Sequence, residues 1–176
     1  MELVIPSVQF KDSFIEGIRE LQSGLATGAT RNYGELSTSD LEVNFEAFVE
    51  KERSHSDGKN LPADFVPQTD FWLVDGGEYI GHVGIRHYLN DHLLKIGGHI
   101  GYSIRPGKRG NGYGTKILEL ALPKAKELGL NRILLTCDVT NIASRKIIER
   151  NGGVLENQIP NPETGIDKLR FWIEIS

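Results

Sequence analysis

The chain has 176 residues, of which 39% are hydrophobic and 25% are charged. This length favours one domain, and the apolar fraction is sufficient for a buried core, so a chain that is disordered throughout is excluded. The 20 lysines and arginines are outnumbered by 24 acidic residues, and the resulting net charge of −4 argues against a general nucleic-acid binder.

The first third of the chain is predicted to consist of helices and loops. Apolar residues recur at helical spacing from Phe14 to Leu25, behind a candidate cap at Asp12 or Ser13. A second helix is predicted to begin near Asp40, and the polar stretch 54–60 should end it. Its apolar face would consist of Leu41, Phe45, Phe48 and Val49.

From Asp70 onwards the hydrophobic period becomes that of β-strands. Three runs, at 71–75, 78–89 and 93–104, predict an antiparallel meander with a hairpin at Asp75–Glu78 and a weaker one at Leu89–His92. A helix from Gly112 to about Leu128 should follow, with a kink or weak turn at Pro123.

The remaining elements alternate between strand and helix. They are a buried strand at 131–139, a short helix at 141–151 and two further strands at 154–158 and 169–175. Because regular βαβ alternation is missing from the first half, this order predicts an α/β fold of the mixed α+β kind, with one sheet covered by helices on both faces.

Three glycines lie between a predicted strand and a predicted helix, in the segment IGYSIRPGKRGNGYGT at 100–115. Gly110, Gly112 and Gly114 would let several backbone N–H groups converge on an anion at the start of the helix, although a tight turn without a ligand is the alternative. A Walker loop is excluded because no lysine stands between Gly114 and Thr115, and the dinucleotide-binding spacing is not matched.

The pattern Arg109-x-x-Gly112-x-Gly114 resembles that of the GNAT superfamily of acyl-CoA-dependent N-acetyltransferases. The resemblance extends over about residues 70–176, through the strand before the loop, the strand that contains Cys137, Asn141-x-x-Ser144 and the Gly152-Gly153 turn. The stretches 85–106 and 133–153 are similar to a branch of poorly characterised bacterial acetyltransferases.

This resemblance implies a single acetyltransferase domain over residues 1–176. Its sheet would be mixed, mostly antiparallel, of six to seven strands, and splayed between the two central strands. The helical part at 1–69 would shape the acceptor site, residues 70–158 would form the cofactor-binding core, and 159–176 would supply the terminal strand.

The implied cosubstrate is acetyl-CoA, with its pyrophosphate on the backbone N–H groups of the glycine loop and its pantetheine arm paired with the edge of the preceding strand. Asn141 matches a cofactor-contacting asparagine of the family, and it would also serve as a helix cap. The implied cofactor-binding residues are Tyr102, Ser103, Ile104, Arg109, Gly110, Asn111, Gly112, Tyr113, Gly114, Thr115, Asn141 and Ser144.

The resemblance also implies direct attack of a neutral amine on the thioester, with the backbone N–H of Ile104 stabilising the oxyanion. Many family members place a tyrosine four residues after the position of Ser144 to protonate the leaving sulfur, and here that residue is Ile148. His99 and Asp138, on the strands beside the splay, are candidate catalytic groups; a structural histidine and a solvated aspartate are the alternatives. Tyr33 and Tyr102 are weaker candidates.

We therefore expect an enzyme that transfers an acetyl group from acetyl-CoA to a primary amine of a small molecule or peptide. Because of Ile148, a non-catalytic acyl-CoA-binding or sensor module is the alternative, and a structural or interaction protein that retains only the fold is a third. Arg86 and His87 would shape the acceptor pocket or pair with acidic neighbours on a solvated face.

Several further expectations concern location and partners. No apolar run approaches the roughly 18 residues of a membrane span, and the start of the chain lacks the features of a signal peptide. The single cysteine and the spacing of the five histidines argue against disulfides and a metal site. We expect a cytoplasmic protein with no metal, no nucleic acid and no membrane partner, and a homodimer through the terminal strands stays open.

Overall fold

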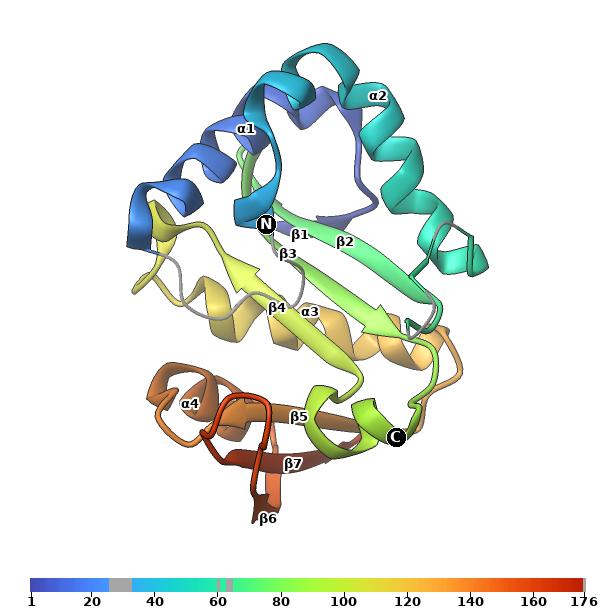
Figure 1. Cartoon of the computed structure of the whole chain (residues 1–176), viewed down its shortest axis with the longest axis vertical. Coiled ribbons are helices and arrows are strands. Elements are labelled where there is room, and N and C mark those ends of the chain that lie inside the picture. The colour runs from blue at the N-terminus through green and yellow to red at the C-terminus, as the bar shows by residue number, and fades with distance from the viewer. Residues whose placement is uncertain (26–32, 60, 63–64, 176) are drawn as a thin grey trace.

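A computed structural model of the chain describes residues 1–25, 33–59, 61–62 and 65–175. Within these ranges, seven strands form two antiparallel sheets (Figure 1). The first sheet has the order β1 (Glu2–Val4), β2 (Gln68–Asp75), β3 (Glu78–Arg86), β4 (Ile100–Ile104), and the second has the order β5 (Arg132–Asp138), β7 (Lys168–Glu174), β6 (Val154–Ile159). The predicted mixed α/β fold and its strand number are confirmed. The single sheet that was expected is divided into two, and these approach each other at β4 and β5.

Helices cover both faces of the first sheet. The helices α1 (Lys11–Glu20) and α2 (Thr38–Ser54) lie over one face, and α3 (Tyr113–Glu127) lies against the other (Figure 1). The short α4 (Ile142–Arg150) follows β5 and packs beside α3. No helix among the described residues is both long enough and apolar enough to cross a membrane.

Strand β2 shows why helices are needed on both sides, since its apolar side chains alternate between two cores. Trp72 belongs to the core under α1 and α2, where its ring stacks on that of Phe14 at 4.5 Å between centroids. Leu73 points to the other core, which contains Ile117 of α3 and Phe171 of β7. This second core therefore includes residues of both sheets.

Two predicted features of the first sheet are wrong. The N-terminal segment was expected to be helix and loop, but β1 pairs with the end of β2, with Leu3 opposite Leu73. The hairpin expected at Leu89–His92 is replaced by a helical turn, η5 (Leu93–Gly97), because the Asn90 side chain accepts from the N–H of Leu93 at 2.9 Å and caps that turn.

One helix prediction is confirmed and one needs correction. The second helix begins at Thr38, close to the predicted start near Asp40, and the Ser37 hydroxyl caps it by accepting from the N–H of Asp40 at 3.2 Å. The kink expected at Pro123 is wrong, because α3 is continuous through this residue. A non-helical backbone conformation occurs instead in α2, at Asn44 (φ −113°, ψ 28°).

One buried guanidinium ties the segment after β4 to helix α1. The Arg105 side chain is only 2% exposed and bonds Glu20, Glu16 (3.0 Å) and Glu78 (3.1 Å). The second carboxylate oxygen of Glu20 accepts from the N–H of Gly107 at 2.9 Å. Glu20 therefore holds both the arginine and the backbone of the loop that leads to α3, and the hydrogen bond from Arg105 lowers the pKa of its carboxyl.

Candidate functional site

The two sheets are joined at one end of β4 by His99. Its backbone N–H donates to the carbonyl of Leu134 at 2.7 Å, and its ring Nδ1 accepts from the backbone N–H of Leu134 at 2.9 Å. The preceding Gly98 has a φ of +68°, and a Cβ there would lie 2.6 Å from the Leu134 carbonyl oxygen. A residue without a side chain is therefore needed at this joint.

Beyond the joint, β4 presents a backbone edge that faces away from β3. The N–H of Arg86 bonds the carbonyl of His99, and the N–H of Arg105 bonds the carbonyl of Ile80, so the odd-numbered residues of β4 direct their polar groups to β3. The N–H groups of Tyr102 and Ile104 consequently face the gap between β4 and β5, which we call the splay. Ser103 does not share this role, because its backbone faces β3.

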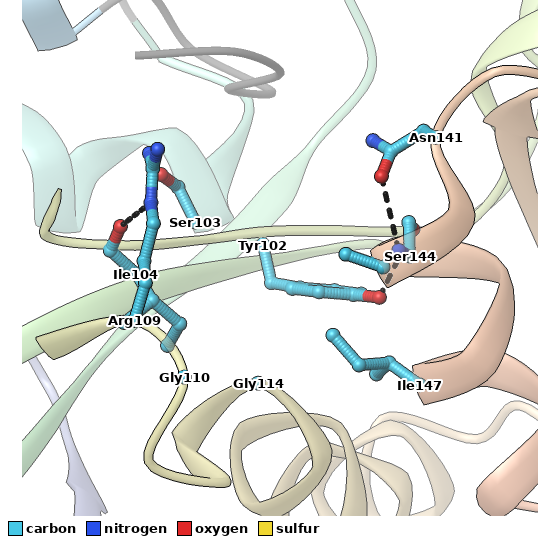
Figure 2. Close-up of a pocket in the computed structure, with 10 residues that line it drawn as sticks. Tyr102, Ser103, Ile104, Arg109, Gly110, Gly114, Asn141, Ser144 and Ile147 are labelled. Carbon is cyan, nitrogen blue, oxygen red and sulfur yellow. Dashed lines mark hydrogen bonds between the residues drawn. The ribbon is translucent and has the colours of Figure 1, made fainter. Parts of the chain in front are cut away.

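A cavity of about 220 Å³ lies between this edge and the start of α4 (Figure 2). Tyr102 extends from β4 toward α4, where its hydroxyl lies 3.1 Å from the Ser144 hydroxyl. The Asn141 side chain accepts from the N–H of Ser144 at 3.0 Å, so its capping role is observed. The lining residues are Tyr102, Ser103, Ile104, Arg109, Gly110, Gly114, Asn141, Ala143, Ser144 and Ile147.

The glycine loop closes the same cavity at the start of α3. Gly110 and Gly112 both have a φ of +81°, and a Cβ on either would meet no atom within 4 Å, so the space before the helix is open. At Gly114 a Cβ would lie 2.5 Å from Cδ1 of Ile147. These glycines therefore allow the turn, leave room in front of the helix, and let α3 approach α4.

The rest of the loop is held by its own hydrogen bonds. The Asn111 amide donates to the carbonyls of Lys108 and Arg109 at 3.3 and 3.2 Å, and the N–H of Thr115 bonds the carbonyl of Gly112 at 3.1 Å. The Tyr113 hydroxyl donates to Asp75 at 3.1 Å, so this side chain reaches the β2–β3 turn. The side chains of Asn111 and Tyr113 are therefore engaged within the protein, so these two residues could contact a ligand through their backbone, whereas the N–H of Thr115 is already bonded.

This cavity fits acyl-CoA in three respects. The first N–H groups of α3 have no carbonyl partner inside the helix and carry its positive dipole end, which suits a pyrophosphate. The Tyr102 and Ile104 edge suits the amides of a pantetheine arm. The Arg109 side chain, whose Nε donates to the carbonyl of Ile104 at 3.0 Å, adds a positive charge between the two.

His99 is placed at the joint rather than among the residues that line the cavity. Burial, with a smaller effect from the charge of Arg86, lowers the pKa of its imidazole to about 4. A neutral imidazole that already accepts a backbone hydrogen bond is suited to holding β4 and β5 together. The proposal that His99 acts as a base has no geometric support.

The pKa of His99 predicts a specific pH dependence of stability. Its ordinary value of 6.5 applies to the unfolded chain, so between pH 6.5 and about 4 the unfolded state binds the proton more readily. We expect the free energy of unfolding to fall through this window as the pH is lowered. Urea titrations of the native protein and of His99→Gln test this, and equal pH slopes for both would contradict it.

Asp138, Ile148 and Cys137 also lie outside the set of residues that line the cavity. Asp138 forms an ion pair with Lys168 at 2.7 Å, which favours its solvated, structural alternative. Ile148 is fully buried in the core shared by the two sheets and carries no acidic proton. Burial raises the pKa of the Cys137 thiol to about 11, so it is protonated at neutral pH.

A buried polar cluster under α2 escaped the sequence analysis. Glu52, His55 and Asp70 bring ligand-type atoms within 4.8 Å of one another, with the His55 Nδ1 lying 3.5 Å from Asp70 and 3.7 Å from Glu52. Tyr33 donates to Glu52, and Gln68 donates to Asp70 at 2.5 Å. These contacts link the end of α2 to β2, and no motif spacing indicated them because Asp70 is far from the others in sequence.

Known proteins share this architecture. A curated relative, the uncharacterized N-acetyltransferase YnaD of Bacillus subtilis strain 168, is 27% identical over 106 residues, which are 57% of this chain and 60% of that protein. This chain thus spans about three fifths of the relative's length.

Two solved structures share the fold. The microcin C7 self-immunity acetyltransferase MccE, solved with acetyl-CoA and AMP, has a TM-score of 0.70 at 17% identity, over 98% of this chain and 91% of that one. An acetyltransferase from Salmonella typhimurium that modifies the N-terminal serine of ribosomal protein L7/L12 has a TM-score of 0.69 at 15% identity, over 99% and 94%.

The sequence pattern itself matches a family model over most of the chain. The model is that of the acetyltransferase (GNAT) domain, and the match covers residues 26–154, which include the glycine loop, the splayed edge of β4 and the start of α4. Because the match covers more than half of the chain, this protein belongs to the GNAT acetyltransferase family.

Proposed function

We propose that the protein transfers an acetyl group from acetyl-CoA to a primary amine. The observation that carries this proposal is the continuity of one cavity, from the N-terminus of α3 along the outward edge of β4 to the hydroxyls of Tyr102 and Ser144. Acetyl-CoA supplies the activated acyl group as a thioester. The chain supplies binding, orientation and proton transfer.

The backbone edge of β4 is proposed to bind and polarise the thioester. The N–H of Ile104 faces the splay, where it can donate to a carbonyl oxygen on which negative charge develops. The amine nitrogen forms a bond to the carbonyl carbon as the carbon–sulfur bond breaks. One proton leaves the nitrogen and one proton is gained by the sulfur, so the reaction is balanced without an oxidant or reductant.

The Tyr102–Ser144 pair is the proposed source of the proton for the sulfur. Its two hydroxyls lie 3.1 Å apart on the cavity wall, while Ile148 offers no proton at the position where the family resemblance places a tyrosine. Burial raises the pKa of Tyr102 to about 12, so its hydroxyl stays protonated at neutral pH and is able to donate.

The test is release of free thiol from acetyl-CoA in the presence of a panel of amines, with identification of the acetylated product by mass spectrometry. Tyr102→Phe is expected to lower kcat about tenfold or more while the dissociation constant of acetyl-CoA stays within about twofold, because general acids typically contribute ~10²–10⁴-fold. An unchanged kcat would remove Tyr102 from the proposed pair.

One observation favours the second candidate, a non-catalytic acyl-CoA-binding module. Ile148 removes the usual acid. Tight binding of acetyl-CoA in calorimetry, together with no thiol release for any amine in the panel, would support this module and overturn the transferase proposal.

A further inference from the structure

The buried cluster of one histidine and two carboxylates at the end of α2 is separate from the cofactor cavity. Its members are Glu52, His55 and Asp70, whose side chains are 6%, 5% and 1% exposed. Glu52 lies in the last turn of α2, and His55 begins the turn η4 (His55–Asp57), which lies beside β2, the strand of Asp70 (Figure 1). None of the three lines the cofactor cavity.

One ligand-type atom of each side chain points to a common centre. Glu52 Oε1 and Asp70 Oδ2 lie 3.7 and 3.5 Å from Nδ1 of His55, and all three ligand-type atoms lie within 4.8 Å of one another. Both distances are longer than an N–H···O hydrogen bond of about 2.7–3.2 Å. They are close to the separation of about 3.4 Å between two ligands of a tetrahedral zinc ion with bonds of about 2.0–2.1 Å. One ion could therefore be bound by all three atoms after small movements.

The other oxygen of each carboxylate is held by a donor from outside the cluster. Tyr33 donates to Oε2 of Glu52, and the Gln68 amide donates to Oδ1 of Asp70 at 2.5 Å. Gln68 has a defined place, since a Cβ at Gly84 would lie 2.2 Å from its amide nitrogen. Outer hydrogen bonds of this kind orient the ligands of metal sites. They leave the inner oxygen of each carboxylate directed toward His55.

A cavity of about 370 Å³ lies against the cluster, with Thr69 and Asp70 in its wall. Arg53 also lines this cavity, and its Nε donates to the carbonyl of Pro6 at 2.8 Å. The space allows a water molecule to complete the coordination of an ion that three protein atoms bind. Removing two carboxylates from water is costly, and a divalent cation that both of them share offsets this cost.

We propose that Glu52, His55 and Asp70 bind a divalent transition-metal ion. Zinc fits this set because it accepts both imidazole nitrogen and carboxylate oxygen. The ion joins the end of α2 to β2 and stabilises the fold without contact with the thioester. The spacing of the histidines did not indicate this site, because two of its three ligands are carboxylates. The inference goes beyond the proposed acetyl transfer and does not depend on it.

The experiment is calorimetric titration of the protein with Zn²⁺, without acetyl-CoA, after treatment with a chelator and without a histidine tag. We expect one ion per chain with a dissociation constant of about 1 μM or lower, and His55→Gln should raise this constant at least about a hundredfold. His92→Gln is the matched control and should bind as the native protein does, because His92 is exposed and lies 3.4 Å from a single carboxylate, that of Glu163. Mg²⁺, which prefers oxygen ligands, should bind much more weakly.

Two further measurements keep the test decisive if His55→Gln does not fold. Tyr33→Phe removes only the hydroxyl that holds Glu52 and should weaken Zn²⁺ binding about tenfold. Saturating Zn²⁺ should also raise the urea midpoint of the native protein, since an ion that binds only the folded state stabilises it.

Three outcomes would overturn the metal site. They are a native dissociation constant above about 100 μM, the same constant for the native protein and for folded His55→Gln, and, if that variant is unfolded by circular dichroism, an unchanged constant for Tyr33→Phe. In each case the two carboxylates and the histidine form a structural polar cluster only. Because no step uses acetyl-CoA, these results leave the transferase proposal to its own test.

Discussion

Replacing Gly112 with glutamate is expected to abolish acetyl-CoA binding, with a dissociation constant raised at least about a hundredfold. Gly112 caps α3 with a φ of +81° and faces open space at the proposed pyrophosphate site. A glutamate there places a carboxylate where two phosphate charges would lie, and a positive φ costs a non-glycine residue about 1–2 kcal/mol. Calorimetric titration with acetyl-CoA measures the loss.

Two further variants isolate the cause. Gly129→Glu puts the same side chain at the other end of the same helix, where φ is +86° and no atom lies within 4 Å of a Cβ, and it should bind acetyl-CoA as the native protein does. Gly112→Ala keeps the backbone strain without the charge and should lose less affinity. If Gly112→Glu retains the native dissociation constant, the pyrophosphate is not bound at this helix.

Replacing Arg105 with alanine is expected to lower the free energy of unfolding by about 3 kcal/mol, because it removes a buried side chain with its charged hydrogen bonds and leaves the buried Tyr79 carbonyl without this donor. The side chain is 2% exposed and bonds three glutamates and the carbonyl of Tyr79. The loop at Gly107 depends on the same Glu20, so affinity for acetyl-CoA should also weaken.

Urea unfolding followed by circular dichroism tests this prediction. Arg19→Ala is the control, since Arg19 is 57% exposed and its ion pair with Glu42 lies at the surface, where the loss should stay under about 1 kcal/mol. A similar small loss for Arg105→Ala would show that the cluster is not a structural anchor.

The geometry of the glycine loop, where we propose that the cofactor binds, could be predicted from the sequence because its information is local. The glycines, Arg109 and the start of α3 lie within a few residues of one another, and backbone geometry alone places their N–H groups. The same holds for Asn141, whose side chain caps the helix that it begins. Short-range patterns of this kind do not depend on tertiary contacts.

The parts that sequence analysis missed depend on residues that are distant along the chain. The environment of His99 is set by Leu134 and that of Arg105 by Glu20. Tyr102 was named from the sequence, but its contact with Ser144 was not. The strand β1 was missed because three residues carry too little periodicity, and it forms only because the edge of β2 accepts it. His99 was a catalytic candidate because of its sequence position beside the splay. Its burial, which lowers the pKa of the imidazole, could not be read from that position.

The joint between Gly98, His99 and Leu134 has a mechanical consequence for the acyl group that the protein accommodates. Two sheets that are held at one end diverge by an angle that this end determines, and the glycine there leaves no space for a larger residue. A larger residue at position 98 would push the Leu134 backbone away and so widen the gap between β4 and β5. We therefore expect a substitution at position 98 to change the size of acyl chain that the proposed site accepts, although this residue does not line the cavity.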